Sequence, residues 1–257
     1  MRKFILLASC ILLVVGAVGA AKPQKQNSGR KKRPPVTAPT ASTFTDNFAN
    51  LNNWIVSDWG APGGGQFKPE HVDVSTGMLR LIVTQDGTTA GSVGGEVQSR
   101  QLFGYGRYDF VVRASSTSPT PEGAGSSVSG QITGCFNFVN DSETEIDAPE
   151  IEGQNPLLLQ FTNWHTTSEN EHTVWPVSWP PEAGFHKYSF IWSVDRIDFL
   201  VDDVLVSTHT QDVPSAPAYI MFNHWGTNST DWGGNATPGV TRYMYVKSVT
   251  FTPSAVG

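Results

Sequence analysis

Residues 196–209 read Arg-Ile-Asp-Phe-Leu-Val-Asp-Asp-Val-Leu-Val-Ser-Thr-His and carry the clearest structural signal in this 257-residue chain. Two runs rich in apolar and β-branched residues, 196–201 and 204–209, flank the pair Asp202-Asp203. Strand-forming residues on both sides of two turn-forming residues are typical of a tight β-hairpin. The stretch therefore predicts two antiparallel strands joined by a short turn.

The sequence after about residue 43 repeats this pattern of short strand-forming runs separated by Gly, Pro, Asn and Asp. Helical periodicity is almost absent, which favours an all-β sandwich or barrel built from two antiparallel sheets. About 210 residues are enough for one large domain, and we expect no second one. The other predicted strands cover residues 54–57, 78–84, 96–99, 106–113, 130–138, 144–151, 157–163, 186–193, 218–224 and 240–252.

The beginning of the chain predicts export. A basic start at residues 1–3 precedes an apolar run at 4–18 and small residues up to Ala20, which is the layout of a secretory signal peptide over residues 1–20. The run is short for a membrane-spanning helix and no second run follows, so we expect a secreted, extracellular protein that does not contact a membrane. Association with a cell wall stays open.

Residues 21–42 are rich in Lys, Arg, Pro, Ser and Thr and contain no acidic residue, which predicts a disordered leader. Its basic run at 29–35 suits a solvated tether, a contact with an anionic wall polymer, or a processing site. The globular domain then spans residues 43–257.

The charge of the chain is unevenly distributed. Eight of the 17 Lys and Arg lie in residues 1–34, whereas all 23 Asp and Glu lie beyond them, so the remainder has a net charge of −14. Nucleic-acid binding needs clustered cations, and a neutral polymer such as a polysaccharide fits this domain better. Because Cys10 belongs to the signal peptide, Cys135 remains alone, and its apolar surroundings predict a buried, inert thiol.

Residues 143–152 read Glu-Thr-Glu-Ile-Asp-Ala-Pro-Glu-Ile-Glu and combine a high density of acidic residues with strand-forming sequence. Side chains alternate along a strand, so Glu145 and Asp147 share one face. Carboxylates at such short distances repel one another and raise one another's pKa. The arrangement suits a glycosidase, which needs one ionised and one protonated carboxyl group at the scissile bond. A solvated edge strand or a calcium site are the alternatives.

The Pro residue in this segment decides on which side Glu150 lies. Strict alternation would turn Glu150 away from Glu145. Proline cannot donate to a sheet ladder and is tolerated mainly at edges and bulges, so we expect a bulge at Ala148-Pro149. One extra residue restores the phase and returns Glu150, and with it Glu152, to the face of Glu145.

Four blocks of the sequence, in the right order, resemble glycoside hydrolase family 16, the group of laminarinases, lichenases and fungal wall transglycosylases. Glu145-Ile-Asp147-Ala-Pro-Glu150 matches the bulged form of the family signature, Glu-x-Asp-x-x-Glu. The other three blocks lie at residues 94–110, 185–203 and 220–225. Together they cover nearly the whole domain.

The resemblance implies a concanavalin-like β-jelly-roll sandwich with a concave glycan cleft and retention at the anomeric carbon. It implies that Glu145 is the nucleophile, Glu150 the acid and base, and Asp147 the neighbour that tunes their protonation. The stretch after the bulge is richer in acid than the family pattern, so Glu152 stays as an alternative to Glu150. We expect no cofactor and no catalytic metal, while a structural calcium ion stays open.

Aromatic side chains stack on sugar rings, and polar side chains beside them bind hydroxyl groups. We assign Trp54 and Trp192, which lie in strand-forming sequence, to the core. The candidate substrate-binding residues are Asn163, Trp164, His165, Trp175, Trp179, His224, Trp225 and Trp232.

Three hypotheses for the function follow. The favoured one is retaining hydrolysis of internal bonds in β-1,3- or mixed β-1,3/1,4-glucan by a monomer. The second is a cell-wall transglycosylase of the β-glucan or chitin-glucan type, which uses the same carboxylates and passes the glycosyl group to another glycan instead of water. Loops such as 164–184 and 225–239 would decide between the two. The third is a lectin-like module, which the presence of both glutamates disfavours.

Overall fold

The fold is a sandwich of two β-sheets. The strands of sheet 1 are β1 (Phe44–Asp46), β4 (Val72–Asp73), β5 (Leu79–Val83), β7 (Gly106–Ser116), β12 (His186–Trp192), β13 (Ile197–Val201), β14 (Val204–His209) and β16 (Arg242–Pro253). The strands of sheet 2 are β2 (Trp54–Val56), β3 (Gln66–Phe67), β6 (Val93–Phe103), β8 (Gln131–Val139), β9 (Thr144–Glu152), β10 (Leu158–Trp164), β11 (Asn170–Pro176) and β15 (Ala218–Gly226).

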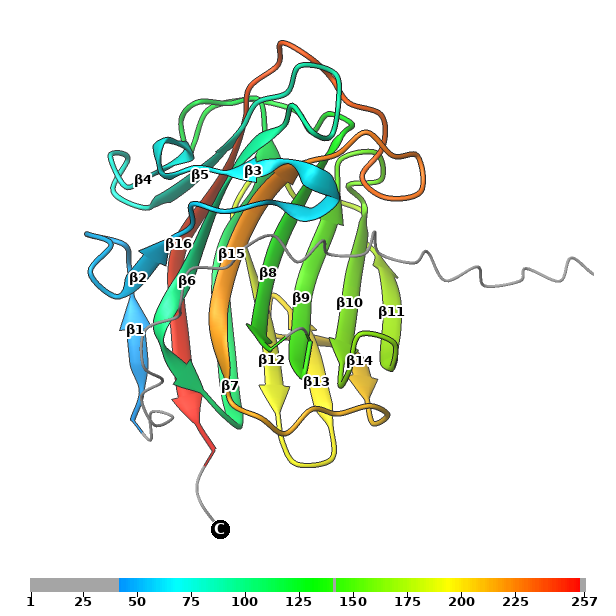
Figure 1. Cartoon of the computed structure of the whole chain (residues 1–257). Helices are drawn as coiled ribbons and strands as arrows, with labels where there is room; N and C mark the ends of the chain where they lie inside the picture. Colours follow the sequence, from blue (N-terminus) through cyan, green and yellow to red (C-terminus); the bar gives the residue numbers. More distant parts are fainter. Residues whose placement is uncertain (1–41, 141, 255–257) are drawn as a thin grey trace, which may run out of the picture.

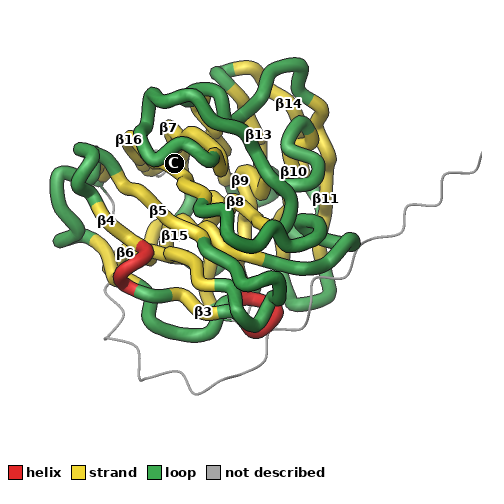
Figure 2. Tube along the Cα trace, turned by 90° about the horizontal axis from the view of Figure 1, so that it is seen from above, coloured by secondary structure: helices red, strands yellow, loops and turns green. Residues whose placement is uncertain are grey.

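The computed structural model describes residues 42–140 and 142–254, and the predicted signal peptide and all of the leader except Ser42 lie outside them. Sheet 1 has the order β14-β13-β12-β7-β16-β5-β4, and sheet 2 has the order β11-β10-β9-β8-β15-β6-β2. Figures 1 and 2 show the two sheets stacked in layers, with β8 to β11 in front of β12 to β14 in the view of Figure 1. The predicted all-β class with two antiparallel sheets is confirmed.

Helical structure is confined to two short 3₁₀ segments within the described part of the chain, η1 (Pro62–Gly64) and η2 (Pro69–His71). No helix among these residues is long and apolar enough to cross a membrane.

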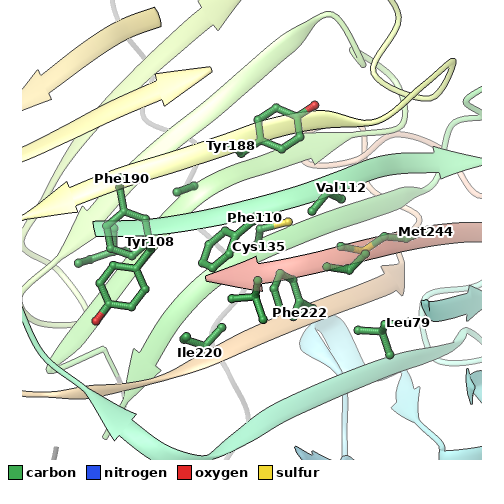
Figure 3. Packing of buried hydrophobic residues seen from close by; sticks show 14 of the residues in the cluster. Leu79, Tyr108, Phe110, Val112, Cys135, Tyr188, Phe190, Ile220, Phe222 and Met244 are labelled. Carbon is green, nitrogen blue, oxygen red and sulfur yellow. The ribbon is translucent and has the colours of Figure 1, made fainter. Parts of the chain in front are cut away.

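The core lies between the two sheets, where strands of both layers present apolar side chains (Figure 3). Phe110 of β7 and Phe222 of β15 meet edge to face across the layers, with ring centroids 5.2 Å apart. Trp54 and Trp192 are 1% and 0% exposed, as predicted. Cys135 is also buried there, as predicted, and burial raises the pKa of its thiol, which disfavours the reactive thiolate.

The hairpin predicted from residues 196–209 is confirmed. Val201 and Val204 pair at its end, and the two residues between them, Asp202 and Asp203, have φ angles of 48° and 66°. A two-residue turn with both φ angles positive matches the twist of the strands, and Asp tolerates this conformation better than most residues do. The Asp202 carboxylate also accepts a hydrogen bond from the Lys187 backbone N–H at 2.9 Å, which fixes the turn to β12.

Four strands of the described residues lie outside the predicted ranges, namely the short strands β1, β3 and β4 and the longer strand β11. We predicted a loop over residues 164–184, whereas residues 170–176 form β11, the edge strand of sheet 2. Its sequence, Asn-Glu-His-Thr-Val-Trp-Pro, is mostly polar, and most of its side chains are exposed. An edge strand that buries so little apolar surface has almost no alternating pattern from which it could be predicted.

Candidate active site

The acidic segment forms strand β9, near the centre of sheet 2. Ile146, Ala148 and Ile151 belong to the core between the sheets. Side chains alternate along a strand, so Glu145 and Asp147 point to the opposite side, which we call the outer face of sheet 2.

A bulge in β9 keeps the later acids on the outer face as well. On both sides of the strand the register shifts between Asp147 and Glu150, so the pair Ala148-Pro149 lies opposite a single residue of each neighbouring strand. The predicted bulge is confirmed, and Glu150 and Glu152 share the outer face with Glu145. The four acids, Glu145, Asp147, Glu150 and Glu152, are 4%, 1%, 7% and 6% exposed.

Each end of this acidic row has its own hydrogen-bond partners. The Ser142 hydroxyl donates to Glu145 Oε2, and the Trp164 indole N–H donates to Asp147 Oδ2 at 3.3 Å. At the other end, Glu152 accepts hydrogen bonds from three N–H groups, among them the Gly233 backbone N–H at 2.7 Å. Glu145 and Glu152 thus contact different loops.

A fifth acid, Glu96, also lies on the outer face, on strand β6. Glu96 of β6 pairs in register with Asn223 of β15, which in turn pairs with Gly134 of β8, the residue directly opposite Glu150. Asn223 Nδ2 donates to Glu96 Oε2 at 3.4 Å, and its Oδ1 lies over Gly134, 2.4 Å from where a Cβ would be. Because Gly134 has no side chain, the Asn223 amide extends across β8 toward β9.

An aromatic cluster adjoins the Glu152 end of the acidic row. Trp225 pairs with Ile132, and Ile132 pairs with Glu152. Around Trp225 and Ile132 pack Ala61, Phe67, Trp59 and Trp232. The Trp59 indole N–H donates to Glu96 Oε1 at 3.0 Å, so the cluster also contacts Glu96. Acids beside partly exposed indole rings are the combination that binds and cleaves sugar polymers.

A family model described as glycosyl hydrolases family 16 matches residues 65–245, which include every acid of this face. The chain belongs to this family. A "Beta-glucanase" from Acetivibrio thermocellus is 31% identical over 227 residues, 82% of this chain and 63% of the relative. This chain therefore spans less than two thirds of that relative's length.

Two further comparisons agree. The "Endo-1,3-1,4-beta-glycanase ExoK" of Rhizobium meliloti is 27% identical over 223 residues, 82% of this chain and 78% of the relative. The solved structure of Bacillus licheniformis beta-glucanase superimposes with a TM-score of 0.72 at 24% identity and covers 84% of this chain and 100% of its own. The jelly-roll fold expected from the resemblance is confirmed.

Three of the predicted substrate-binding residues lie on the outer face of this family 16 domain. Trp164 pairs with Glu145 across β9 and β10 and contacts Asp147. Trp225 and Trp232 belong to the aromatic cluster. These three side chains and the four acids therefore share one surface.

Two predicted substrate-binding residues lie on the wrong side of sheet 2. Asn163 and His224 are both 0% exposed. His224 bridges the sheets, with Nδ1 3.1 Å from Leu81 O and Nε2 2.9 Å from Ser115 Oγ. Burial disfavours the imidazolium form and lowers the pKa of His224 to about 3. Its role is structural, because no side chain in this position reaches a glycan on the outer face.

Asn163 has a similar structural role. Its Nδ2 donates to Gln211 O at 3.0 Å and to Asp212 O at 2.8 Å, and its Oδ1 lies 2.6 Å from His209 Nδ1. These contacts join β10 to the end of β14 and the loop that follows it. As with His224, the side chain of Asn163 points inward because it lies one position along the strand from a residue that points to the outer face.

The remaining three candidates lie at the rim of the sandwich. Trp175 pairs with Leu159, a core residue, so it shares the inner side of sheet 2 at its edge. Trp179 stacks on the His186 ring of sheet 1, with centroids 3.5 Å apart. His165 is exposed in the turn between β10 and β11. The structure does not bring these residues together with the acids.

Several outer-face residues were not predicted as site residues. They are Glu96, Asn223, Trp59, Phe67, Gln160 and His172. The polar alternation of Glu96 and Gln98 within a predicted strand was the available signal for the first. Gln160 and His172 are joined by a hydrogen bond of 2.9 Å between strands β10 and β11. This contact could not be predicted because β11 was not predicted as a strand.

Proposed function

We propose that this family 16 protein is a retaining endo-glycosidase that hydrolyses β-1,3- or mixed β-1,3/1,4-glucan. The observation that carries the proposal is the row of carboxyl groups on one face of β9, which the bulge keeps in phase. The names of the relatives, Beta-glucanase and Endo-1,3-1,4-beta-glycanase, support the substrate class.

Glu145 is the nucleophile in this proposal. Its carboxylate attacks the anomeric carbon while Glu150 gives its proton to the departing glycosidic oxygen, which leaves a covalent glycosyl-enzyme. Glu150 then takes a proton from water, the water oxygen attacks the anomeric carbon, and Glu145 is released. Two inversions give net retention. Retention requires the two carboxyl groups to approach to about 5–5.5 Å in the reacting complex.

The neighbours of Glu145 suit this role. The Ser142 hydroxyl donates to Glu145, and a hydrogen bond to a carboxylate favours its ionised form, which is the form that attacks. Asp147 stands between Glu145 and Glu150 on the outer face, where its charge influences the protonation of both. The Trp164 N–H contact fixes Asp147 in this position.

The contacts of Glu152 favour Glu150 as the acid and base. Glu152 already accepts hydrogen bonds from Gln154, Gln160 and the Gly233 backbone. A proton donor must turn toward the glycosidic oxygen and release its proton there. A side chain held by three N–H donors is suited to remain an acceptor.

We further propose that the protein is exported and acts outside the cell. The proposal rests on the basic start, apolar run and small residues at positions 1–20, and a polymeric substrate requires an extracellular enzyme when the polymer lies outside the cell. Protein in the culture medium whose N-terminus begins after residue 20 would support it, and full-length protein retained in the cell would contradict it.

The function is tested with the purified full chain and three substrates: laminarin, barley β-glucan and chito-oligosaccharides. Products are followed over time by mass spectrometry, and the anomer formed first is read by NMR. We expect shorter oligosaccharides from one or both glucans, released first as the β-anomer. Products longer than the starting chains would instead indicate a transglycosylase, and unchanged glucans would contradict the proposal.

A further inference from the structure

The carboxylate of Glu152 is held by three uncharged donors from three parts of the chain. The Gly233 N–H and Gln154 Nε2 both donate to Oε2 at 2.7 Å, and Gln160 Nε2 donates to Oε1 at 3.3 Å. The side chain is 6% exposed. Neutral N–H groups solvate a carboxylate without cancelling its charge, so a negative charge is fixed at this point of the outer face.

The Gln160 amide is itself oriented by a neighbour. His172 Nε2 lies 2.9 Å from Gln160 Oε1, so His172 donates to the amide oxygen and the amide nitrogen turns toward Glu152. Each hydrogen bond is therefore donated toward Glu152, from His172 on β11 to Gln160 on β10 and from Gln160 to Glu152 on β9.

Glu150 is the neighbouring acid on the same strand. It precedes Glu152 by one full step on the same face of β9, and Gln160 lies directly opposite it on β10. Successive side chains on one face of a strand are close enough for unit charges to interact strongly at low exposure.

The titratable groups that face Glu150 come from several neighbouring elements. On β9 they are Glu145 and Asp147, which are also acids. The residues of β8 and β10 on this side, Gly134, Ile132 and Gln160, have no titratable side chain. The other titratable groups are His172 on β11, Glu96 on β6 behind Asn223, and Asp231 in the exposed part of the loop after β15.

We propose that Glu152 is a positioning residue whose fixed negative charge keeps Glu150 protonated before the glycosidic bond breaks. The inference rests on the proposed function of Glu150. A second anion beside Glu152 is unfavourable, so Glu150 holds its proton up to a higher pH and gives it only to the departing oxygen. The same repulsion makes the resulting Glu150 carboxylate a stronger base toward the attacking water.

Glu152→Gln separates the charge from the hydrogen bonds. The carbonyl oxygen of the introduced amide can still accept from Gly233 and Gln154, and its nitrogen can donate to Gln160 once the Gln160 amide rotates and the neutral His172 ring changes tautomer. Glu152→Ala removes both the charge and the contacts. Asp231→Asn is the matched control, since it removes one exposed acid from the neighbouring loop and leaves the network intact.

The test is a titration of Glu150 in the full chain by NMR of ¹³C-carboxyl-labelled glutamate, assigned by the signal lost in Glu150→Gln. The titration needs no substrate, so it stays informative if the glucans are not cleaved. We expect the Glu150 midpoint to fall by roughly one pH unit or more in Glu152→Gln and to stay in place in Asp231→Asn. An unchanged midpoint in Glu152→Gln would overturn the proposal, as would equal shifts in both variants.

The pH dependence of kcat/KM on the cleaved glucan gives the second readout. The alkaline limb reports loss of the protonated acid, so it should move to lower pH in Glu152→Gln, while the acidic limb stays in place. A merely structural role would lower kcat/KM equally at every pH, and that result would also overturn the proposal. Absence of glucan cleavage by the wild type would instead contradict the proposed function alone.

Discussion

The two faces of strand β9 differ in the roles that we assign to them, the inner face to stability and the outer face to the proposed catalysis. Ile146, Ala148 and Ile151 point into the core between the sheets and are 0–2% exposed. Glu145 and its three acidic neighbours, which alternate with these residues, point to the outer face. The acids bring like charges together at low exposure, an arrangement that favours function over stability. One strand can carry both because the bulge keeps the two sets of residues in phase.

The largest effect should come from removing either carboxylate of the proposed pair. Glu145→Gln and Glu150→Gln should each lower kcat on glucan by roughly 10³-fold or more, because a nucleophile or a proton donor is lost. Neither change opens a cavity, and each removes a like charge, so the unfolding free energy should stay the same or rise slightly. Steady-state kinetics and denaturant unfolding measure the two quantities. A variant that keeps most of its activity would contradict the assignment.

The opposite face should give the opposite result. Ile146→Ala removes a core side chain of the same strand and should lower the unfolding free energy by about 2–5 kcal/mol. At a temperature where the variant is folded, its kcat should be within a few-fold of the wild type. If Ile146→Ala loses activity as completely as Glu150→Gln while folded, the division between the two faces of β9 is wrong.

His224 adds a pH dependence to the stability of the core side. Its pKa is about 3 in the folded protein and near 6.5 when unfolded, so the unfolded chain binds the extra proton as the pH falls. Stability should be fully present above about pH 6.5 and be lost toward pH 3, by up to about 1.4 kcal/mol per pH unit from this group. Denaturant unfolding at several pH values between about pH 4 and pH 6 measures this dependence. The unfolding free energy of His224→Gln should change less with pH than that of the wild type. An equal change of unfolding free energy with pH in the two proteins would mean that His224 is not buried as a neutral ring.

The smallest effect concerns substrate binding. Trp232 lies in the aromatic cluster of the outer face, whereas Trp175 lies at the sheet edge on the inner side. Trp232→Ala should raise KM for glucan about tenfold with a smaller change in kcat, because one stacking surface is lost. Trp175→Ala, which removes an equally large aromatic ring, should leave both constants unchanged. Equal effects of the two changes would place the substrate elsewhere.

The sequence allowed the prediction of the bulge, the acids and the hairpin because each depends on local chemistry. A proline among alternating acids and two turn-forming residues between β-branched runs each have one good structural solution. Prediction failed where the sequence lacks a clear alternation of apolar and polar residues. β11 buries too little, so its polar sequence resembles a loop.

The two misplaced residues show a different limit. All nine residues of β15 are buried, those on the outer face as well as those in the core. Asn223 and His224 are then equally polar neighbours in a continuous apolar run, and alternation cannot tell which one points outward. The pairing of β15 with β8 and β6 decides it. Asn163 was misplaced for the same reason, and Glu96 was missed because its partner, Asn223, is 127 residues away.

The most direct test of the account is to trap the covalent intermediate. The full chain is incubated with an activated 2-deoxy-2-fluoro β-glucan oligosaccharide, which slows the second step, and the labelled peptide is sequenced by mass spectrometry. The account predicts one glycosyl group per molecule attached to Glu145. A label on Asp147, Glu150 or Glu152, or an active enzyme that accumulates no label, would contradict the assignment of Glu145 as the nucleophile.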